Sequence, residues 1–406
     1  MSIVQSLIET FQKDGWNGTD IYNRVLALRE DKEISYQFLE QYLLIFEKSA
    51  TFFDALLSYI DDHHLVKLLE LVFCKKNLDI QSSVVESLIE YISLMNPILL
   101  HPYLEDIVKR KSNSYLAYFP WRDLDKNSIE YWKEKLQQSR DKQEQIKYVE
   151  ILLQTRDKES VSYVYHYAKD NEIMEEDTLL YYMEDIGFTI KNGKIITYFS
   201  SPASHMVFEP HYIKSTSHPT WHSESQSISY RMGGEMLQSS PENPFCHILT
   251  LNPVPKNIAI GLNRIVFAMH IRELNEGYEP FYLHDKEGNP SKIVTEEEIE
   301  IVYGEDKPIK ETSVSFAFIP QHWQRQDWAL SNSRENLFRM GGEPTWVQSA
   351  HVPVCPKCNQ KMHYIMQLDS ILPDISDGEV WFGSGGIAYL FWCDACCVSG
   401  YTIQFT

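Results

Sequence analysis

Long uncharged apolar runs are missing from this 406-residue sequence, and its first residues show no basic segment followed by an apolar core. A membrane-spanning helix needs roughly 18 apolar residues in succession, and a secretory signal needs the basic and apolar segments together. We therefore expect a cytoplasmic protein that neither crosses a membrane nor is exported.

Cysteine is also scarce, with seven residues in the whole chain. A secreted disulfide scaffold is short and rich in cysteine, so that class is excluded. Five of the seven cysteines fall between residues 355 and 397. This clustering indicates a metal site rather than a set of disulfides.

Catalytic signatures are missing as well: there is no H-E-x-x-H pair, nucleophile elbow or nucleotide-binding loop. His218 and His222 are four residues apart, but Pro219 argues against a continuous helix, so loop histidines are the simpler interpretation. A hydrolase that uses a cleft between two β subdomains is one functional hypothesis. Its candidate residues are His218, His222 and Glu235 or Glu343.

Basic residues are few, with 37 Lys and Arg against 57 Asp and Glu, for a formal net charge of −20. Residues 1–200 hold 23 against 33 and residues 201–406 hold 14 against 24, so each half carries −10. This field repels phosphate backbones and anionic membranes, so we expect neither nucleic acid nor membrane as a partner. It favours a basic protein partner, although acidity for solubility alone is the simpler explanation.

The first part of the chain predicts helices. Hydrophobic residues make up 43% of the sequence, and up to about residue 186 they recur at helical spacing, as in Ile3, Val4, Leu7, Ile8 and Phe11. Short breaks separate the periodic segments, which is typical of stacked helical hairpins. We predict an α-helical repeat domain over residues 1–186, a HEAT-like solenoid. No sharp repeat signature occurs, so an irregular helical bundle is the alternative.

Near residue 187 the hydrophobic period changes from about 3.6 to 2, which predicts a mostly β domain over residues 187–406. Residues 188–199 read as a β-hairpin because Asn192-Gly193 suits a type I′ turn. Further strands are predicted at 246–251, 264–271, 314–319, 362–368 and 387–392. The expected fold class is α+β.

A short internal sequence repeat occurs in the β half. Residues 230–235 (Tyr-Arg-Met-Gly-Gly-Glu) match residues 338–343 (Phe-Arg-Met-Gly-Gly-Glu), and an alternating strand follows each copy. We infer two pseudo-repeats, at about 218–320 and 330–406, packed about a pseudo-twofold axis. Positive φ or close strand approach explains the Gly-Gly pairs better than a phosphate-binding role, because no Lys-Ser/Thr follows either pair.

The strongest chemical motif is two C-x2-C pairs, Cys355/Cys358 and Cys393/Cys396, separated by 34 residues. Four thiolates on two tight turns can surround one Zn²⁺ tetrahedrally, in the manner of a zinc ribbon. Such a site has no open coordination position, so the zinc is expected to be structural. Cys397 is the alternative to Cys396 as the fourth ligand.

The same region carries a family resemblance. Residues 338–348, Cys355-Pro-Lys-Cys358, residues 366–370 and residues 386–393 resemble the YwqG-like family of bacterial proteins of unknown function. The order of C-x2-C, Gln-Leu and Tyr-x-Phe-x-Cys is also similar to the C-terminal domain of programmed-cell-death-two proteins, which are chaperones of a ribosomal protein. The resemblance covers residues 200–406 at most. It implies a duplicated β fold and protein-binding roles, and it supplies no catalytic residues.

Architecture and charge together favour a non-enzymatic protein-binding factor. Helical repeats before a β module look similar to bacterial immunity proteins, and the acidic charge suits a basic toxin domain as the partner. A client chaperone or scaffold with a structural zinc is the second hypothesis. Fold alone does not decide between the two roles.

Overall fold

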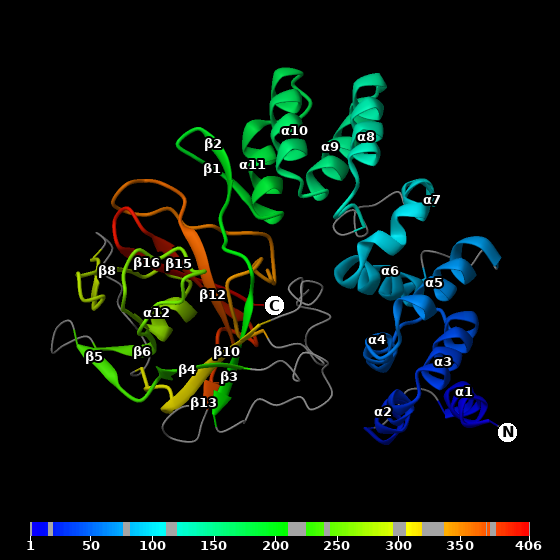
Figure 1. Ribbon diagram of the computed structural model, residues 1–406, viewed down its shortest axis with the longest axis horizontal. Coiled ribbons are helices and arrows are strands. Elements are labelled where there is room, and N and C mark those ends of the chain that lie inside the picture. Colours follow the sequence, from blue (N-terminus) through cyan, green and yellow to red (C-terminus); the bar gives the residue numbers. More distant parts are fainter. Residues whose placement is uncertain are drawn as a thin grey trace. The chain divides into compact units, whose positions relative to one another are not determined.

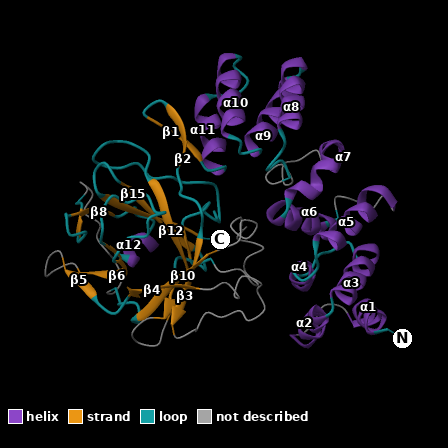
Figure 2. Cartoon of the chain, in the orientation of Figure 1, coloured by secondary structure: helices purple, strands orange, loops and turns teal. Residues whose placement is uncertain are grey.

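The computed structural model describes residues 2–14, 19–75, 82–110, 120–209, 225–238, 244–294, 306–318, 337–370, 372–373 and 379–405. The chain divides into two compact units, Met1–Glu175 and Glu176–Thr406. Helices make up the first unit and strands dominate the second (Figures 1 and 2). The mixed helix and sheet content that the sequence predicts is therefore present.

The first unit is a succession of short helices. They are α1 (Ile3–Asp14), α2 (Thr19–Leu26), η1 (Ala27–Glu30), α3 (Lys32–Ile45), α4 (Thr51–Leu57), α5 (Asp62–Glu70), η2 (Leu71–Lys75), α6 (Ser83–Met95), η3 (Pro97–Tyr103), α7 (Leu104–Arg110), α8 (Lys126–Gln138), α9 (Lys142–Gln154) and α10 (Lys158–Asp170). An aspartate caps the N-terminus of several of them by accepting a hydrogen bond from a backbone N–H two or three residues later: Asp31, Asp61, Asp125, Asp141 and Asp157. Such caps satisfy N–H groups that have no partner inside the helix.

The apolar stripes that predict these helices form the core of the first unit. In α1, Val4, Leu7, Ile8 and Phe11 are buried, whereas Ile3 at the start of the helix is exposed. The helix α6 is buried more completely, from Val84 to Met95 along most of its length. Within the described residues, no helix combines the length and apolar character that crossing a bilayer requires.

The second unit begins with a helix, α11 (Glu176–Asp185), that packs on a hairpin of β1 (Phe188–Lys191) and β2 (Lys194–Thr197). Asn192 and Gly193 both have positive φ, 52° and 71°, and Phe188 pairs with Thr197. The predicted hairpin is confirmed. The predicted domain boundary at residue 186 falls after α11, whereas the division into compact units precedes this helix.

Twelve strands of the described chain form one large sheet. They are β3 (Ser204–Glu209), β4 (Ser225–Met232), β5 (Met236–Gln238), β6 (Pro244–Leu251), β7 (Ile265–Met269), β8 (Phe281–His284), β9 (Pro290–Lys292), β10 (Thr312–Phe318), β11 (Arg339–Met340), β12 (His363–Asp369), β15 (Ile387–Cys393) and β16 (Val398–Gln404). The helix α12 (Ile271–Asn275) and the small pair β13 (Leu372–Pro373) and β14 (Glu379–Val380) complete the unit. The five strands predicted between residues 246 and 392 correspond to β6, β7, β10, β12 and β15.

The strand order is β5-β6-β4-β10-β3-β11-β12-β15-β16-β8-β9, with β7 also paired to β6. The pair β10/β3 lies at the centre of this order. On the side of β10, the strands β4, β6 and β7 follow one another outward; on the side of β3, the strands β11, β12 and β15 occupy the matching positions. The Arg-Met-Gly-Gly segments occupy matching places in this order. The N–H of Gly233 donates to Ile248 across from β4, and the N–H of Gly341 donates to Ile365 across from β11.

All four glycines of the two Gly-Gly pairs have positive φ, between 66° and 92°. A Cβ on Gly233 would lie 2.6 Å from the carbonyl oxygen of Ile309, closer than real Cβ atoms come to backbone. Both causes predicted for these pairs, positive φ and close approach of backbone, therefore operate.

Candidate metal centre

The first C-x2-C pair lies on a tight turn before β12. The N–H of Cys355 donates to the carbonyl of Gln360 at 2.9 Å, and the N–H of Asn359 donates back to the carbonyl of Cys355 at 2.9 Å. Val354 and Lys361 form an isolated antiparallel bridge that closes the turn. This backbone pattern directs both thiols to the same side of the turn.

The second C-x2-C pair lies where β15 turns into β16. Cys393 is the last residue of β15 and pairs with Val398, the first residue of β16. The N–H of Cys396 donates to the carbonyl of Cys393 at 3.3 Å, and Cys397 closes the turn with a positive φ of 51°. The connection is therefore short enough to hold the second pair of thiols beside the first.

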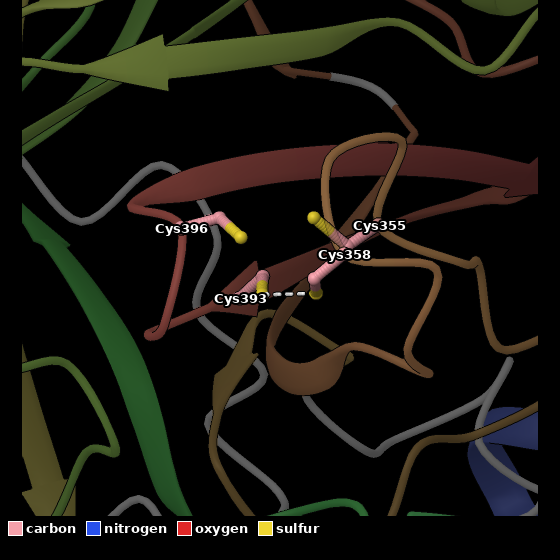
Figure 3. A group of neighbouring side chains, drawn as sticks. All are labelled: Cys355, Cys358, Cys393 and Cys396. Carbon is pink, nitrogen blue, oxygen red and sulfur yellow. Dashed lines mark hydrogen bonds between the residues drawn. The ribbon is translucent and has the colours of Figure 1, made fainter.

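The four predicted ligands, Cys355, Cys358, Cys393 and Cys396, come together in one cluster (Figure 3). Their sulfur atoms all lie within 4.8 Å of one another, and the Sγ atoms of Cys358 and Cys393 are 3.6 Å apart. A tetrahedral site with metal–sulfur bonds of about 2.3 Å has sulfur–sulfur edges of about 3.8 Å. The cluster is therefore compatible with a single metal ion bound by four thiolates.

The four thiols differ in burial, and the pKa values of Cys393 and Cys358 shift in opposite directions. Cys355 and Cys393 are fully buried, and desolvation raises the pKa of Cys393. Burial also acts to raise the pKa of Cys358, but hydrogen bonds from the backbone N–H of Gln360 and from the neighbouring thiols outweigh it, so this pKa is lowered. A metal ion needs four thiolates, so its binding at pH 7 must release protons, among them that of Cys393.

Cys397 lies outside the group of four. Its thiol contacts the carbonyl oxygen of Asp394 at 3.9 Å. The carboxylate of Asp394 accepts hydrogen bonds from the N–H of Gly261, at 2.6 Å, and from the indole of Trp392, at 3.0 Å. These bonds fix the turn in a conformation that offers Cys396, rather than Cys397, to the cluster.

Residues far away in the sequence support the first turn. The ammonium group of Lys361 lies 3.0 Å from the carboxylate of Glu184 and donates to the carbonyl of Val352. Glu184 is nearly buried and also accepts from the hydroxyl of Thr189. Sequence alone does not predict this pair, because no local pattern relates residue 184 to residue 361.

The described part of the chain does not bring the candidate residues of the hydrolase hypothesis together in one site. His218 and His222 lie outside the described residues. Glu235 follows β4 and forms an exposed ion pair with Arg231 at 2.9 Å. Glu343 follows β11, and three strand spacings, or about 14 Å, separate these two strands in the sheet.

A serine–histidine pair that no sequence motif predicts lies at the start of β12. The hydroxyl of Ser200 is 2.8 Å from Nε2 of His363, and burial lowers the pKa of His363 to about 4. A base for serine activation works best with a pKa near the operating pH and a carboxylate that orients its ring. No carboxylate among the described residues bonds to the other ring nitrogen of His363. The pair is best explained as hydrogen bonding of a partly buried histidine.

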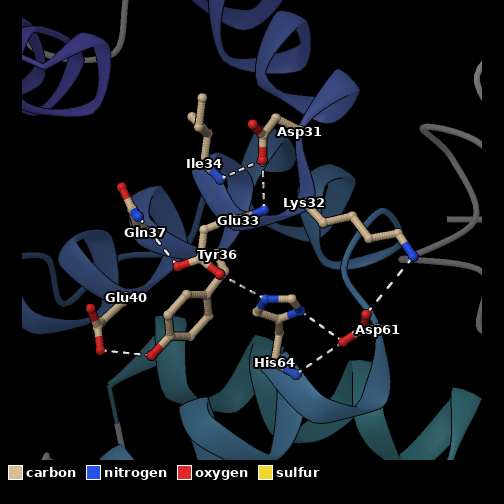
Figure 4. Close-up of polar contacts among 9 residues, drawn as sticks. All are labelled: Asp31, Lys32, Glu33, Ile34, Tyr36, Gln37, Glu40, Asp61 and His64. Carbon is tan, nitrogen blue, oxygen red and sulfur yellow. Dashed lines mark hydrogen bonds and ion pairs between the residues drawn. The ribbon is translucent and has the colours of Figure 1, made fainter.

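A second polar cluster lies in the first unit, between α3 and α5 (Figure 4). The ring of the buried His64 faces Asp61 through Nδ1, at 2.7 Å, and Glu33 through Nε2, at 3.3 Å. The hydrogen bond with His64 lowers the pKa of Glu33. Each ring nitrogen of His64 thus faces a carboxylate, Asp61 at the N-terminus of α5 and Glu33 on α3. This cluster joins two helices electrostatically.

Comparison with known proteins adds little to this geometry. No protein-family model matches the chain, and no solved structure matches it. The chain is 35% identical over 68 residues to the uncharacterized protein YpfL of Salmonella typhimurium, which covers 17% of this chain. The chain spans about 15% of the length of that relative. The similarity is therefore local.

Proposed function

We propose that this chain is a non-enzymatic protein-binding factor whose sheet unit is stabilised by one structural Zn²⁺. The four-cysteine cluster carries this proposal. Four protein thiolates complete a tetrahedral shell and leave no coordination position for water or substrate, which is the property that separates structural from catalytic zinc sites. Tetrahedral sulfur sites suit zinc or iron, and elemental analysis of the purified protein distinguishes these metals.

The folds of the two units complete the proposal. The helices of the first unit form a HEAT-like repeat, a type of structure that presents extended binding surfaces. The sheet unit is a duplicated, YwqG-like fold. The mirrored strand order around β10 and β3 and the matching hydrogen bonds of Gly233 and Gly341 support the duplication.

The role that we propose is immunity: the protein binds and neutralises a cognate toxin with a basic domain. The charge of −10 in each half supports a basic partner, because complementary charge accelerates the encounter of two proteins. The association rate should therefore fall as ionic strength rises, since exposed charges are screened over about 8–10 Å at physiological salt.

Co-purification from the native host, with mass spectrometry of the bound proteins, tests this role. Recovery of a basic toxin domain, and rescue of toxin-exposed cells by this chain, supports immunity. Recovery of a ribosomal or other housekeeping protein favours a client chaperone instead. The absence of any partner, combined with turnover of a small molecule that is lost in His218→Ala or His222→Ala, contradicts the protein-binding function.

A further inference from the structure

One edge of β16 is only partly paired. The strand β8 pairs with β16 from Val398 to Gly400 and no further, and the last contact along this edge is the N–H of Tyr401, which donates to the carbonyl of Pro280 at 3.2 Å. Successive residues of a strand direct their backbone groups to opposite sides. The carbonyl of Tyr401 and both backbone groups of Ile403 therefore point away from β15, and no strand of the described chain pairs with them.

A pocket of about 380 Å³ lies beside this unpaired edge. Three segments line it: residues 277–279, which precede β8, residues 348–351, and residues 402–405 at the end of β16. Hydrogen bonds between two of these segments hold the walls of the pocket together. The amide of Gln404 donates to the carbonyl of Ser349 at 2.6 Å and accepts from the N–H of Gln348 at 2.9 Å. The pocket is thus the space that remains where residues 277–279 diverge from β16.

Thr402, one of the residues that line this pocket, has a buried hydroxyl without a hydrogen-bond partner among the described residues. The residue is only 3% exposed. Leaving a buried hydroxyl without a partner costs about 1–3 kcal/mol. A group that donates to this oxygen, or accepts from it, recovers that free energy.

Exposed aromatic side chains surround the pocket. Tyr278 and Phe405 line it and are 40% and 37% exposed. Trp381 is 46% exposed, and its carbonyl accepts from Asn275, two residues before the pocket segment 277–279. The hydroxyl of Tyr181 contacts Ser349 in the wall. Aromatic residues concentrated at a concave polar site are typical of peptide-binding surfaces.

The charges of the residues that line the pocket favour an uncharged side chain as the group that enters it. The lining contains one acidic and one basic side chain, Glu279 and His351, and these two are hydrogen-bonded to each other. Because these two side chains pair with each other, the lining offers no unpaired charge that would attract a charged group. The net charge of the whole chain, in contrast, favours basic residues on either side of the inserted group.

We infer that an extended, basic peptide segment of a partner protein adds as a strand to the edge of β16 at residues 401–405 and inserts an uncharged polar side chain beside Thr402. Main-chain hydrogen bonds to Tyr401 and Ile403 give affinity in this mode of recognition, and the pocket gives specificity. The inference rests on the proposed protein-binding function and assigns it a site.

Selection from a phage-displayed library of random 12-residue peptides, with the zinc-loaded full-length protein as bait, tests the site. We expect the selected sequences to share Ser, Thr, Asn or Gln at one position and Lys or Arg beside it. The variant Ile403→Pro removes an N–H that points away from β15, so the hydrogen bonds between β15 and β16 are kept. It should weaken binding of a selected peptide at least tenfold, while the control Ile403→Val, which keeps this N–H, should change it less than twofold.

Thr402→Val provides a test that does not endanger folding. It replaces the hydroxyl by a methyl group of similar size, so thermal stability should be kept or raised while peptide affinity falls about fivefold or more. Peptides that bind both Ile403→Pro and Thr402→Val as well as the native protein would overturn the site. Retention of the co-purified partner by these two variants would overturn the site and leave the protein-binding function intact, whereas the absence of both peptides and partner contradicts the function itself.

Discussion

Removal of the metal from the four-cysteine cluster should destabilise the sheet unit by several kcal/mol. Structural zinc bound through cysteine ligands contributes an apparent free energy of about 10–16 kcal/mol at pH 7, and 12 kcal/mol corresponds to a Kd of about 1 nM. At 1 μM free zinc, roughly a thousand times this Kd, binding to the folded state alone adds about 4 kcal/mol of stability. The Tm of a unit of this size changes by about 2–4 °C per kcal/mol, so chelation should lower it by about 8–16 °C.

The variant Cys358→Ser removes a ligand that is only half-buried, so its effect on core packing is small. We expect elemental analysis to find one zinc per native chain and none in the variant. Calorimetry should show the lowered Tm in the variant without added chelator. Cys397→Ser is the matched control, because this thiol lies outside the cluster; its zinc content and Tm should stay native.

Two results would refute this reasoning. Full zinc content in Cys358→Ser would show that the metal binds elsewhere. A Tm that does not respond to chelation of a zinc-containing native protein would show that the metal does not stabilise the fold. Loss of zinc in Cys397→Ser, with Cys396→Ser unaffected, would assign the fourth ligand to Cys397.

Two further predictions concern histidines. Burial lowers the pKa of both His284 and His363 to about 4, so their neutral rings stabilise the fold above pH 6.5 and that stability is lost as the pH falls toward 4. Between pH 6.5 and pH 5, the free energy of unfolding in urea should fall by about 1.5 kcal/mol less in His363→Gln than in the native protein, and an unchanged pH dependence contradicts the assignment. In the first unit, His64→Leu should lower the free energy of unfolding by about 1–2 kcal/mol, measured by hydrogen exchange in α3 and α5, because it removes the hydrogen-bond partner that the ring offers to two carboxylates. Lys32→Ala should cost less than about 0.5 kcal/mol, since its ion pair with Asp61 is exposed; equal effects would refute the role of His64.

Local pattern was sufficient to predict the elements whose stabilising contacts are local. The change of hydrophobic period marks the start of the sheet unit to within about a dozen residues, and the hairpin at Asn192-Gly193 follows from turn chemistry. The spacing of the cysteines also predicts which four thiols meet. In each case the information lies within a few residues or in an unusual residue type.

Elements whose stabilising contacts come from distant parts of the chain cannot be predicted from local sequence. The strand β16 alternates between apolar and polar residues only from Tyr401 to Gln404, a run too short to stand out, and both of its faces are covered; Ser399 and Thr402 are buried together with its apolar residues. The strand β11 has two residues, too few for any period to appear. The helix α11 looks like the helices before it, and only its packing on β1 assigns it to the sheet unit.

The metal cluster and the proposed peptide site lie at opposite ends of β16, and the strand couples them. Cys393 and Cys396 flank the turn that leads into the strand, so a metal ion there fixes the register between β15 and β16. A slip of one residue would turn every side chain of β16 to the other face and would direct the backbone groups of Ile403 toward β15. Chelation of zinc should therefore weaken binding of a selected peptide at least tenfold, measured by titration calorimetry at a temperature where the apo protein remains folded. Unchanged affinity in the metal-free protein would show that the seven pairs between β15 and β16 hold this register without the metal.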